Sequence, residues 1–297
     1  MHIMRITLKA KPVKHMDIQW YPGHMAKARR QVQQSLGLVD VVIELLDARI
    51  PASSRNPDIN EILRAKPRVV ALNKADLADP EATRAWLELF RRDGHAAAAV
   101  DARRGKGIKR LVQLTEQQAR PAIARYVSRG RRARPARCMV VGVPNVGKSM
   151  LINRLAGKKV ARTENRPGVT RGEQWIRLGR GLELLDTPGI LWPKFADPEV
   201  AFKLAVTGAV KEQIYEPENL CLKLVQWLAE AAPGVLARHY GLAGTPLTPW
   251  EVVELVGRQR GFITAGGQVD MHRTSVVILK DFREGRLGGY TLDFPEQ

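Results

Sequence analysis

Apolar residues before residue 190 gather in short continuous runs, at 39–46, 68–72, 97–101, 138–141 and 182–185. Runs of this length, bounded by turns, are typical of strands that are buried on both faces of a parallel sheet. The intervening segments 24–36, 56–63, 81–91 and 108–129 are predicted to be helices. The alternation predicts an α/β domain with a mostly parallel sheet and helices on both faces.

The pattern changes at segment 216–219, where Glu-Pro-Glu-Asn predicts a domain boundary and a helix start. Helical spacing continues along one apolar face at Leu220, Leu224, Val225 and Leu228. Segments 249–260 and 269–284 predict two further helices. We therefore expect a basic, disordered arm over 1–16, an α/β domain over 17–215 and a small all-helical domain over 216–297.

Segment 142–149, GVPNVGKS, fits the phosphate-loop pattern G-x-x-x-x-G-K-[ST] without a mismatch. It lies between a predicted strand at 138–141 and a predicted helix at 150–155, whereas a chance match in a Gly-rich turn would lack these flanks. In such a loop the backbone N–H groups and the helix N-terminus attract phosphate. Lys148 would reach the β- and γ-phosphates, and Ser149 would hold Mg²⁺. The residues expected at the phosphates are Pro144, Asn145, Val146, Gly147, Lys148, Ser149 and Met150.

A second motif, N-K-x-D, follows the predicted strand 68–72 as Asn73, Lys74 and Asp76. An Asp76 carboxylate can accept from both N1–H and the 2-amino group of guanine, a donor pair that adenine lacks. Alone this motif is weak, but beside a phosphate loop it predicts a guanine site. The loop 101–107 lies where an S-A-K element usually backs the base, and the Ala102 backbone is the expected contact, although Asp101 replaces the usual small residue.

The third motif, D-x-x-G, comprises Asp186 and Gly189 after the predicted strand 182–185. Asp186 would assist Mg²⁺, the Gly189 N–H would meet the γ-phosphate, and Thr170 would complete the Mg²⁺ shell when that phosphate is present. Ordinary GTPases carry N-K-x-D last, whereas here it comes first. The motif order is therefore circularly permuted.

These motifs, with QWYPGHMAKA at 19–28, DARIP at 47–51 and segment 202–210, resemble the circularly permuted ribosome-biogenesis GTPase A (YlqF) family. The resemblance extends from residue 17 to the C-terminus. It implies a circularly permuted Ras-like P-loop GTPase domain, followed by the small helical domain, with GTP/GDP and Mg²⁺ as ligands. It also implies a precursor of the large ribosomal subunit and its rRNA as partners.

The resemblance further suggests two residue roles. Ile190 occupies the place of the glutamine that orients water in Ras-like GTPases, and an aliphatic side chain cannot do so. His24 in the segment 19–28 is the family's candidate catalytic residue, and Asn145 resembles an asparagine that lets some GTPases bind K⁺.

Arg49 follows the predicted strand 39–46 and could contact nucleotide or RNA, but we favour a structural salt bridge.

The net charge of +18 indicates a polyanionic partner. All of the cation excess lies before Glu216, and no acid occurs between Glu116 and Glu164. A nucleotide does not require so many cations, whereas rRNA would; a merely solvated basic face is the alternative. The arginines that crowd this acid-free segment are Arg120, Arg125, Arg129, Arg131, Arg132, Arg134 and Arg137.

A local RNA-binding face in the helical domain is the second possibility, with ordinary solvated cations as its alternative. The residues that would form this face are Arg258, Arg260, Arg273, Lys280, Arg283 and Arg286.

The two cysteines, Cys138 and Cys221, lie in apolar segments and are expected to be buried free thiols in a reducing cytoplasm. No apolar run approaches the roughly 18 residues that span a bilayer, so we expect a cytoplasmic monomer that does not enter membranes. Two other functions stay open at this point. One is a P-loop phosphotransferase acting on a small molecule, and the other is a GTP-gated RNA-binding protein whose turnover is incidental.

Overall fold

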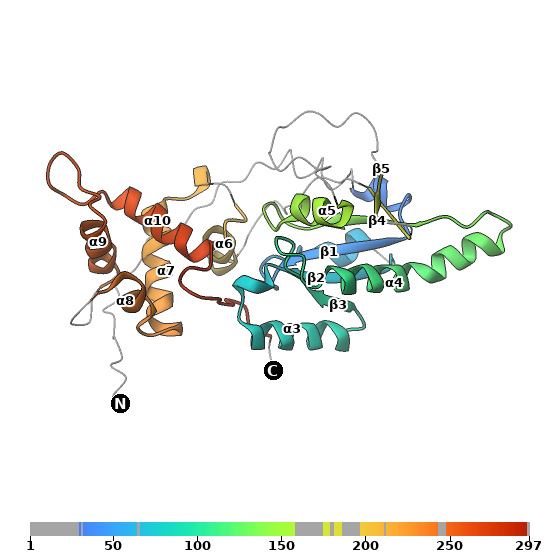
Figure 1. Ribbon diagram of the computed structural model, residues 1–297, viewed down its shortest axis with the longest axis horizontal. Coiled ribbons are helices and arrows are strands. Elements are labelled where there is room, and N and C mark those ends of the chain that lie inside the picture. The colour runs from blue at the N-terminus through green and yellow to red at the C-terminus, as the bar shows by residue number, and fades with distance from the viewer. Residues whose placement is uncertain are drawn as a thin grey trace. The chain divides into compact units, whose positions relative to one another are not determined.

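The computed structural model describes residues 30, 32–63, 66–157, 175–178, 181–185, 197–210, 212–242 and 248–295 (Figure 1). They form two compact units: an α/β unit up to residue 195 that also includes 290–295, and a helical unit over 197–289. This division differs from the predicted boundary at 216 in two respects. A helix at 198–206 groups with the helical unit, and the last described residues group with the α/β unit.

The α/β unit is built on a six-stranded sheet in the order β3-β2-β1-β4-β6-β5. The strands are β1 (Val41–Asp47), β2 (Arg68–Asn73), β3 (Ala96–Ala99), β4 (Ala136–Val141), β5 (Trp175–Leu178) and β6 (Leu182–Leu185). All neighbours are parallel except β5 and β6. The strands that the apolar runs predict are all present, and β5 is an additional one.

Strands β1 and β4 lie side by side at the centre of the sheet, with Val41 opposite Cys138. From this pair the first half of the chain adds strands towards one edge and the second half towards the other. Open α/β sheets bind ligands at such a switch point, outside the carboxyl ends of the strands. The switch point therefore places the end of β1 beside the phosphate loop that follows β4.

Helices α2 (Ile59–Leu63), α3 (Pro80–Arg92), α4 (Ile108–Ser128) and α5 (Lys148–Ala156) connect the strands, and the short 3-10 helix η1 (Ala75–Leu77) follows β2. Local signals fix the start of α3: Asp79 accepts from the Ala82 N–H at 2.7 Å, and Pro80 takes the first helical position. Trp86 and Phe90 then pack against the sheet. The predicted helices are confirmed to within a few residues at their ends, apart from 24–36, of which only residues 30 and 32–36 are described, as helix.

The helical unit contains α6 (Pro198–Val206), η2 (Glu212–Ile214), α7 (Pro217–Ala231), α8 (Val235–Tyr240), α9 (Pro249–Gln259) and α10 (Met271–Arg283). The predicted apolar face of α7 is fully buried against α10 and α9. Helix α9 comes close to α10 at Gly257, where a Cβ atom would lie 2.6 Å from the Thr274 hydroxyl. Among the described helices, none combines the length and the apolar character that crossing a membrane requires.

Candidate functional site

The phosphate loop leaves β4 and ends at α5, as the sequence predicts. Its two motif glycines are required for different reasons. A Cβ atom on Gly142 would lie 2.4 Å from the Leu45 carbonyl oxygen of β1, and one on Gly147 would lie 2.3 Å from Asn73 Nδ2. Gly147 also has a φ of +105°, and Asn145 has a φ of +56°. The backbone of this loop therefore has no room for a side chain at either glycine.

Lys148 begins α5 and its ammonium turns back over the loop, where it donates to the carbonyls of Gly142 at 3.0 Å and Val143 at 2.7 Å. Burial lowers the pKa of Lys148 to about 8. Ser149 follows Lys148 in the first turn of α5. Met150, one residue further on, is exposed, so only its backbone is suited to a phosphate contact.

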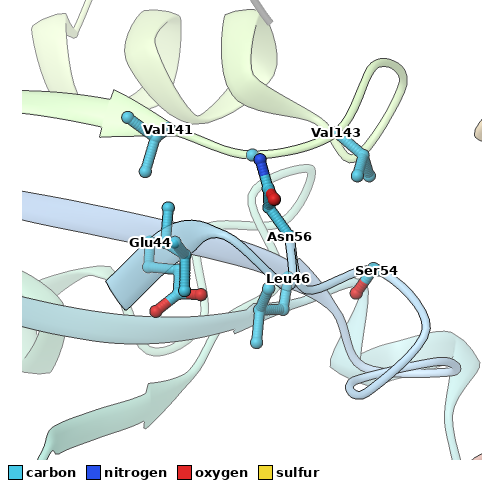
Figure 2. A pocket seen from close by; sticks show the side chains of 8 residues that line it. Glu44, Leu46, Ser54, Asn56, Val141 and Val143 are labelled. Atoms are coloured by element: carbon cyan, nitrogen blue, oxygen red, sulfur yellow. The ribbon is translucent and has the colours of Figure 1, made fainter. Parts of the chain in front are cut away.

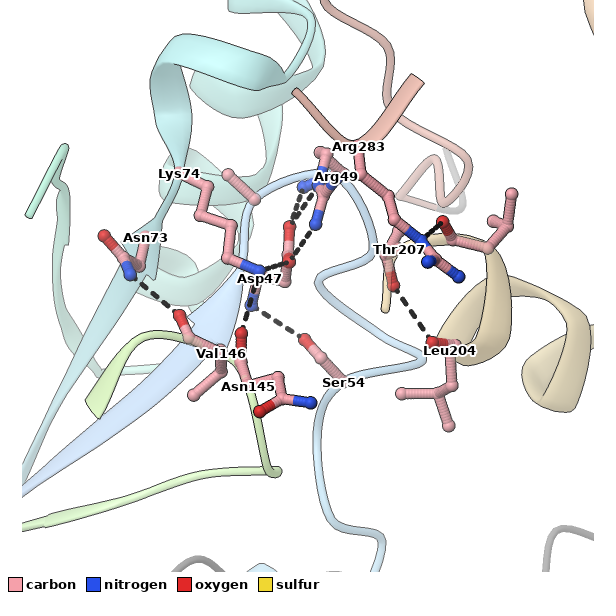
Figure 3. Close-up of polar contacts among 12 residues, drawn as sticks. Asp47, Arg49, Ser54, Asn73, Lys74, Asn145, Val146, Leu204, Thr207 and Arg283 are labelled. Carbon is pink, nitrogen blue, oxygen red and sulfur yellow. Dashed lines mark hydrogen bonds and ion pairs between the residues drawn. The ribbon is translucent and has the colours of Figure 1, made fainter. Parts of the chain in front are cut away.

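Asn73 links three segments that are far apart in the sequence. Its side-chain amide donates to the Val146 carbonyl in the phosphate loop at 2.8 Å (Figure 3). Its side-chain oxygen accepts from the Ala102 N–H at 3.1 Å. The buried asparagine thus holds the phosphate loop, the end of β2 and the loop 101–107 together. The N-K-x-D segment and the phosphate loop, which come in inverted order in the sequence, therefore lie against each other.

Lys74 lies in the left-handed region at φ 59° and has two anchors at its ammonium (Figure 3). It donates to the Asn145 carbonyl at 2.9 Å and pairs with Asp47 at 2.9 Å. Asp47 is buried at the end of β1 and is also held by Arg49 in a bidentate pair at 2.7 and 2.9 Å. Burial alone would raise the pKa of Asp47, but Arg49 and Lys74 outweigh it and hold that pKa well below its usual range. Arg49 therefore closes a structural salt bridge, as favoured from the sequence.

Asp76, the predicted guanine reader, lies in η1 with 19% of its side chain exposed. Arg104 from the loop 101–107 pairs with it at 3.3 Å, and Arg104 is itself 64% exposed. Asp101 lies under this loop and accepts from the Arg104 N–H at 2.9 Å, so the residue that departs from the usual small one serves the loop's own fold. Arg154 of α5 fixes the same loop by donating to the Ala102 carbonyl at 3.2 Å.

A small cavity lies between β1 and the start of the phosphate loop (Figure 2). It is of the size that a single water molecule occupies. Its polar lining includes Glu44, which is buried in β1 and pairs with Arg55 at 3.1 Å and with Arg68 at 3.3 Å. The residues that line it are Glu44, Leu46, Ser54, Asn56, Ile59, Val141, Gly142 and Val143. The cavity is a packing feature behind the loop and is far too small for a nucleotide.

Four predicted site residues lie outside the described part of the chain: His24, Thr170, Asp186 and Gly189. Among the described residues no cluster of three or more His, Cys, Asp or Glu side chains could hold a metal ion. Of the predicted Mg²⁺ ligands, Ser149 is the one that the structure describes. The described part of the site fits a guanine nucleotide: it has a loop that a Cβ atom would block, a part-buried lysine at Lys148 and a partly exposed carboxylate at Asp76.

Two contacts of the N-K-x-D residues were not predicted from the sequence: Asp47 with Lys74, and Arg104 with Asp76. A carboxylate at the carboxyl end of a buried strand beside the predicted site is a signal for the first. The second had no signal, since Arg103, Arg104 and Lys106 are equally basic in the sequence.

The sequence profile described as 50S ribosome-binding GTPase matches residues 137–231. The match begins at the phosphate-loop strand, so N-K-x-D lies before it, in keeping with the permuted order. "Ribosome biogenesis GTPase A" of Priestia megaterium is 48% identical over 95% of this chain and 98% of its own length.

Two solved structures of YlqF from Thermotoga maritima are also similar. The GDP-bound one has a TM-score of 0.65 and 28% identity and covers 90% of this chain and all of its own. The GNP-bound one has a TM-score of 0.64 and 30% identity and covers 91% of this chain and 99% of its own.

Proposed function

This chain belongs to the ribosome biogenesis GTPase A family, and on that premise we propose that it is a GTP-switched assembly factor of the large ribosomal subunit. It is a GTPase with a circularly permuted domain. In its GTP-bound form it would bind the immature particle through rRNA, and hydrolysis would release it. We propose that it acts as a monomer in the cytoplasm, where its two buried thiols stay reduced.

The observation that carries this proposal is the double contact of Asn73 with Val146 and Ala102. These contacts hold the N-K-x-D segment against the phosphate loop in a chain whose motif order is inverted, which supports a shared guanine-nucleotide site. A phosphotransferase for small molecules needs an acceptor pocket and does not need N-K-x-D. The pairing therefore favours a GTPase over that alternative.

The rRNA part of the proposal is supported by the far end of α4. We define the basic extension as residues 120–132, the second half of α4 and the turn that follows (Figure 1). No residue of it is buried, and within the described chain none of its arginines lies within 4.0 Å of a carboxylate. The arginines in question are Arg120, Arg125, Arg129, Arg131 and Arg132. An exposed helix end with uncompensated cations fits the phosphate backbone of RNA.

For the nucleotide we propose that Asp76 and the Ala102 backbone recognise guanine, and that Lys148 contacts the β- and γ-phosphates. Mg²⁺ would be held by Ser149, with Thr170 and Asp186 as further ligands, and would neutralise phosphate charge when bound. K⁺ at Asn145 would add positive charge beside the β- and γ-phosphates.

His24 is proposed as the residue that assists the attacking water. Its support is the family resemblance and the aliphatic Ile190 after the D-x-x-G motif. We predict that His24→Ala leaves GTP affinity near the wild-type value but depresses particle-stimulated turnover about 100-fold, in the range of general acid–base effects. Unchanged stimulated turnover would remove His24 from the site.

The deciding experiment measures GTP hydrolysis with and without precursor large-subunit particles, together with co-sedimentation in a non-hydrolysable GTP analogue. Stimulation by particles and GTP-dependent co-sedimentation support the assembly factor. Binding without stimulation supports an RNA-binding protein whose turnover is incidental. Phosphate transfer to a small molecule, or equal use of ATP and GTP, would overturn the proposal.

A further inference from the structure

The last described residues do not continue the helical unit that precedes them but pack into the α/β unit. We call Tyr290–Phe294 the C-terminal tail. Asp293 is buried, and its main-chain carbonyl accepts from Trp86 Nε1 at 2.8 Å, whereas Phe294 next to it is 68% exposed. Chain ends are ordered only where specific contacts hold them. The burial within this tail therefore points to a docked segment with a defined register.

One side of the tail holds the loop 48–54, which follows β1. The Leu292 N–H donates to the Arg49 carbonyl at 2.7 Å. The Asp293 carboxylate accepts from the Ser53 N–H at 2.7 Å and from the Ser53 hydroxyl at 3.0 Å. A buried carboxylate with two such donors fixes the loop strongly, because each lost partner would leave a polar group unsatisfied.

The other side of the tail holds the segment directly after the guanine reader. The Tyr290 N–H donates to the Leu77 carbonyl at 3.1 Å, and the Thr291 hydroxyl accepts from the Asp79 N–H at 3.1 Å. Leu77 is the last residue of η1, the 3-10 helix that carries Asp76. The tail is thus hydrogen-bonded to the backbone at Leu77, one residue after Asp76, the predicted base contact.

The loop 48–54 reaches the site through Asp47. Ser54 accepts from the Asp47 N–H at 3.0 Å, and Arg49 grips the Asp47 carboxylate (Figure 3). Asp47 in turn holds the Lys74 ammonium at 2.9 Å. Hydrogen-bonded contacts therefore run from the tail to Lys74 on one side and to Asp76 on the other.

We propose that the C-terminal tail positions the guanine-reading element, with Asp293 as its main positioning residue. The hydrogen bonds of the tail described above go to Arg49, Ser53, Leu77, Asp79 and Trp86 rather than to the proposed nucleotide contacts, so the tail acts by fixing the two segments from which Lys74 and Asp76 project. Base selection by Asp76 needs both guanine N–H groups to meet one carboxylate in a fixed orientation. Loosening η1 weakens that match more than it weakens contacts to the phosphates. This inference rests on the proposed guanine site.

The test compares Asp293→Ala with wild type by calorimetric binding of GDP and of IDP, whose base lacks the 2-amino group. We expect GDP to bind about tenfold more weakly, of the order expected when a buried hydrogen-bonding carboxylate is truncated. We also expect the ratio of the IDP to the GDP dissociation constant to fall towards one, because Asp76 no longer reads the 2-amino group sharply. Phe294→Ala, in the same tail but exposed, is the matched control and should leave both dissociation constants unchanged.

A uniform loss of affinity for GDP and IDP, with their ratio preserved, would reduce the tail to a general stabiliser and overturn the proposal. Unchanged binding would overturn it as well. If Asp293→Ala does not fold, Ser53→Ala and Thr291→Val each remove one tail contact and carry the same test. Wild-type protein that does not prefer GDP over IDP would instead refute the guanine site itself, so the two failures are distinguishable.

Discussion

The basic extension of α4 and the helical unit are both rich in arginine, but their cations are used differently. In the helical unit nearly every candidate RNA-binding cation has a carboxylate within 4.0 Å: Arg258, Arg260, Lys280, Arg283 and Arg286 pair with Glu254, Asp281, Glu284 and Glu212. Arg273 lies 4.2 Å from the centre of the Phe262 ring. In the basic extension no arginine has a carboxylate of the described chain within 4.0 Å, although Arg131 lies 5.1 Å from the centre of the Tyr126 ring.

The difference separates cations that are paired with carboxylates, of which those at Asp281 stabilise the fold, from cations that remain available to bind an anionic partner. Asp281 is fully buried, so the arginines around it compensate a charge that would otherwise be costly to bury. No residue in 120–132 is buried, so the cations there contribute little to stability and remain available for the polyanionic partner that we propose. Equal abundance in the sequence thus conceals unequal roles. The expectation of an RNA-binding face made by all six helical cations loses its support.

The largest effect is expected when three cations of the basic extension are removed at once, which tests whether its arginines, unpaired within the described chain, bind RNA. For Arg125→Ala/Arg129→Ala/Arg132→Ala we expect affinity for large-subunit rRNA to fall on the order of 100-fold near 0.1 M salt, and the slope of log affinity against log salt to decrease by about 2. Filter binding at several salt concentrations measures both quantities. Nucleotide binding should be unchanged, because none of the three residues lies near the site.

The matched control is Arg258→Ala/Arg260→Ala/Lys280→Ala, which removes the same number of charges from the helical unit, all three paired with a carboxylate. We expect its rRNA affinity to stay within about threefold of wild type, since partnered cations release few counterions. Equal losses in the two triple variants would mean that pairing does not decide RNA binding here.

A second test reverses the roles and measures stability. Arg260→Ala/Arg286→Ala leaves the buried Asp281 with the Tyr240 hydroxyl at 3.0 Å as its main donor. We expect the helical unit to lose about 2 kcal/mol, less than a fully buried pair because both arginines are partly exposed. The readout is thiol labelling of Cys221, which lies buried in α7 and whose pKa burial raises to about 12.

Cys138 is the internal reference for that experiment, because it lies in β4 of the α/β unit and burial raises its pKa to about 12 too. Labelling of Cys221 should accelerate on the order of 10- to 30-fold, as expected if labelling follows local opening, while Cys138 should stay as slow as in wild type. Equal acceleration of the two thiols would show that Asp281 stabilises the chain as a whole. The exposed pair variant Glu254→Ala/Arg258→Ala should change neither rate appreciably.

The features that could be predicted from the sequence are those set by residues close together in the chain. The buried strands show as apolar runs because both faces of a parallel strand are covered. Gly142 and Gly147 show as a motif because the loop has no room for a Cβ atom. The permuted order could be read because each motif is local, although their convergence through Asn73 could only be expected.

Long-range pairing has no such local signal. Nothing in the sequence links Asp293 to Ser53, and a short terminal segment predicts a loose end more readily than a docked one. The extended segment β5 was missed because it is short and pairs antiparallel only at the sheet edge. The sequence also could not show that Arg134 is paired with a carboxylate of the described chain while Arg132 is not. The partner of Arg134 is Asp40, which lies 94 residues earlier in the sequence.

Arg134 gives the finest test, because it lies in the same run of arginines as the extension but has a partner. It grips Asp40 with two hydrogen bonds at 2.7 and 3.0 Å, which raises the pKa of its guanidinium. For Arg134→Ala we expect about 1 kcal/mol of destabilisation, less than in the helical unit because Asp40 keeps the Arg137 N–H at 2.8 Å. Cys138 labelling should accelerate about fivefold.

The neighbouring variant Arg132→Ala should do the opposite: no change in Cys138 labelling, and a decrease of about 0.7 in the salt slope for rRNA. The two substitutions remove the same side chain two residues apart, so composition and net charge are matched. If Arg134→Ala lowered the salt slope as much as Arg132→Ala while leaving Cys138 protected, the Asp40 pair would not restrain Arg134 in solution. The distinction between stabilising and available arginines would then fail at its boundary.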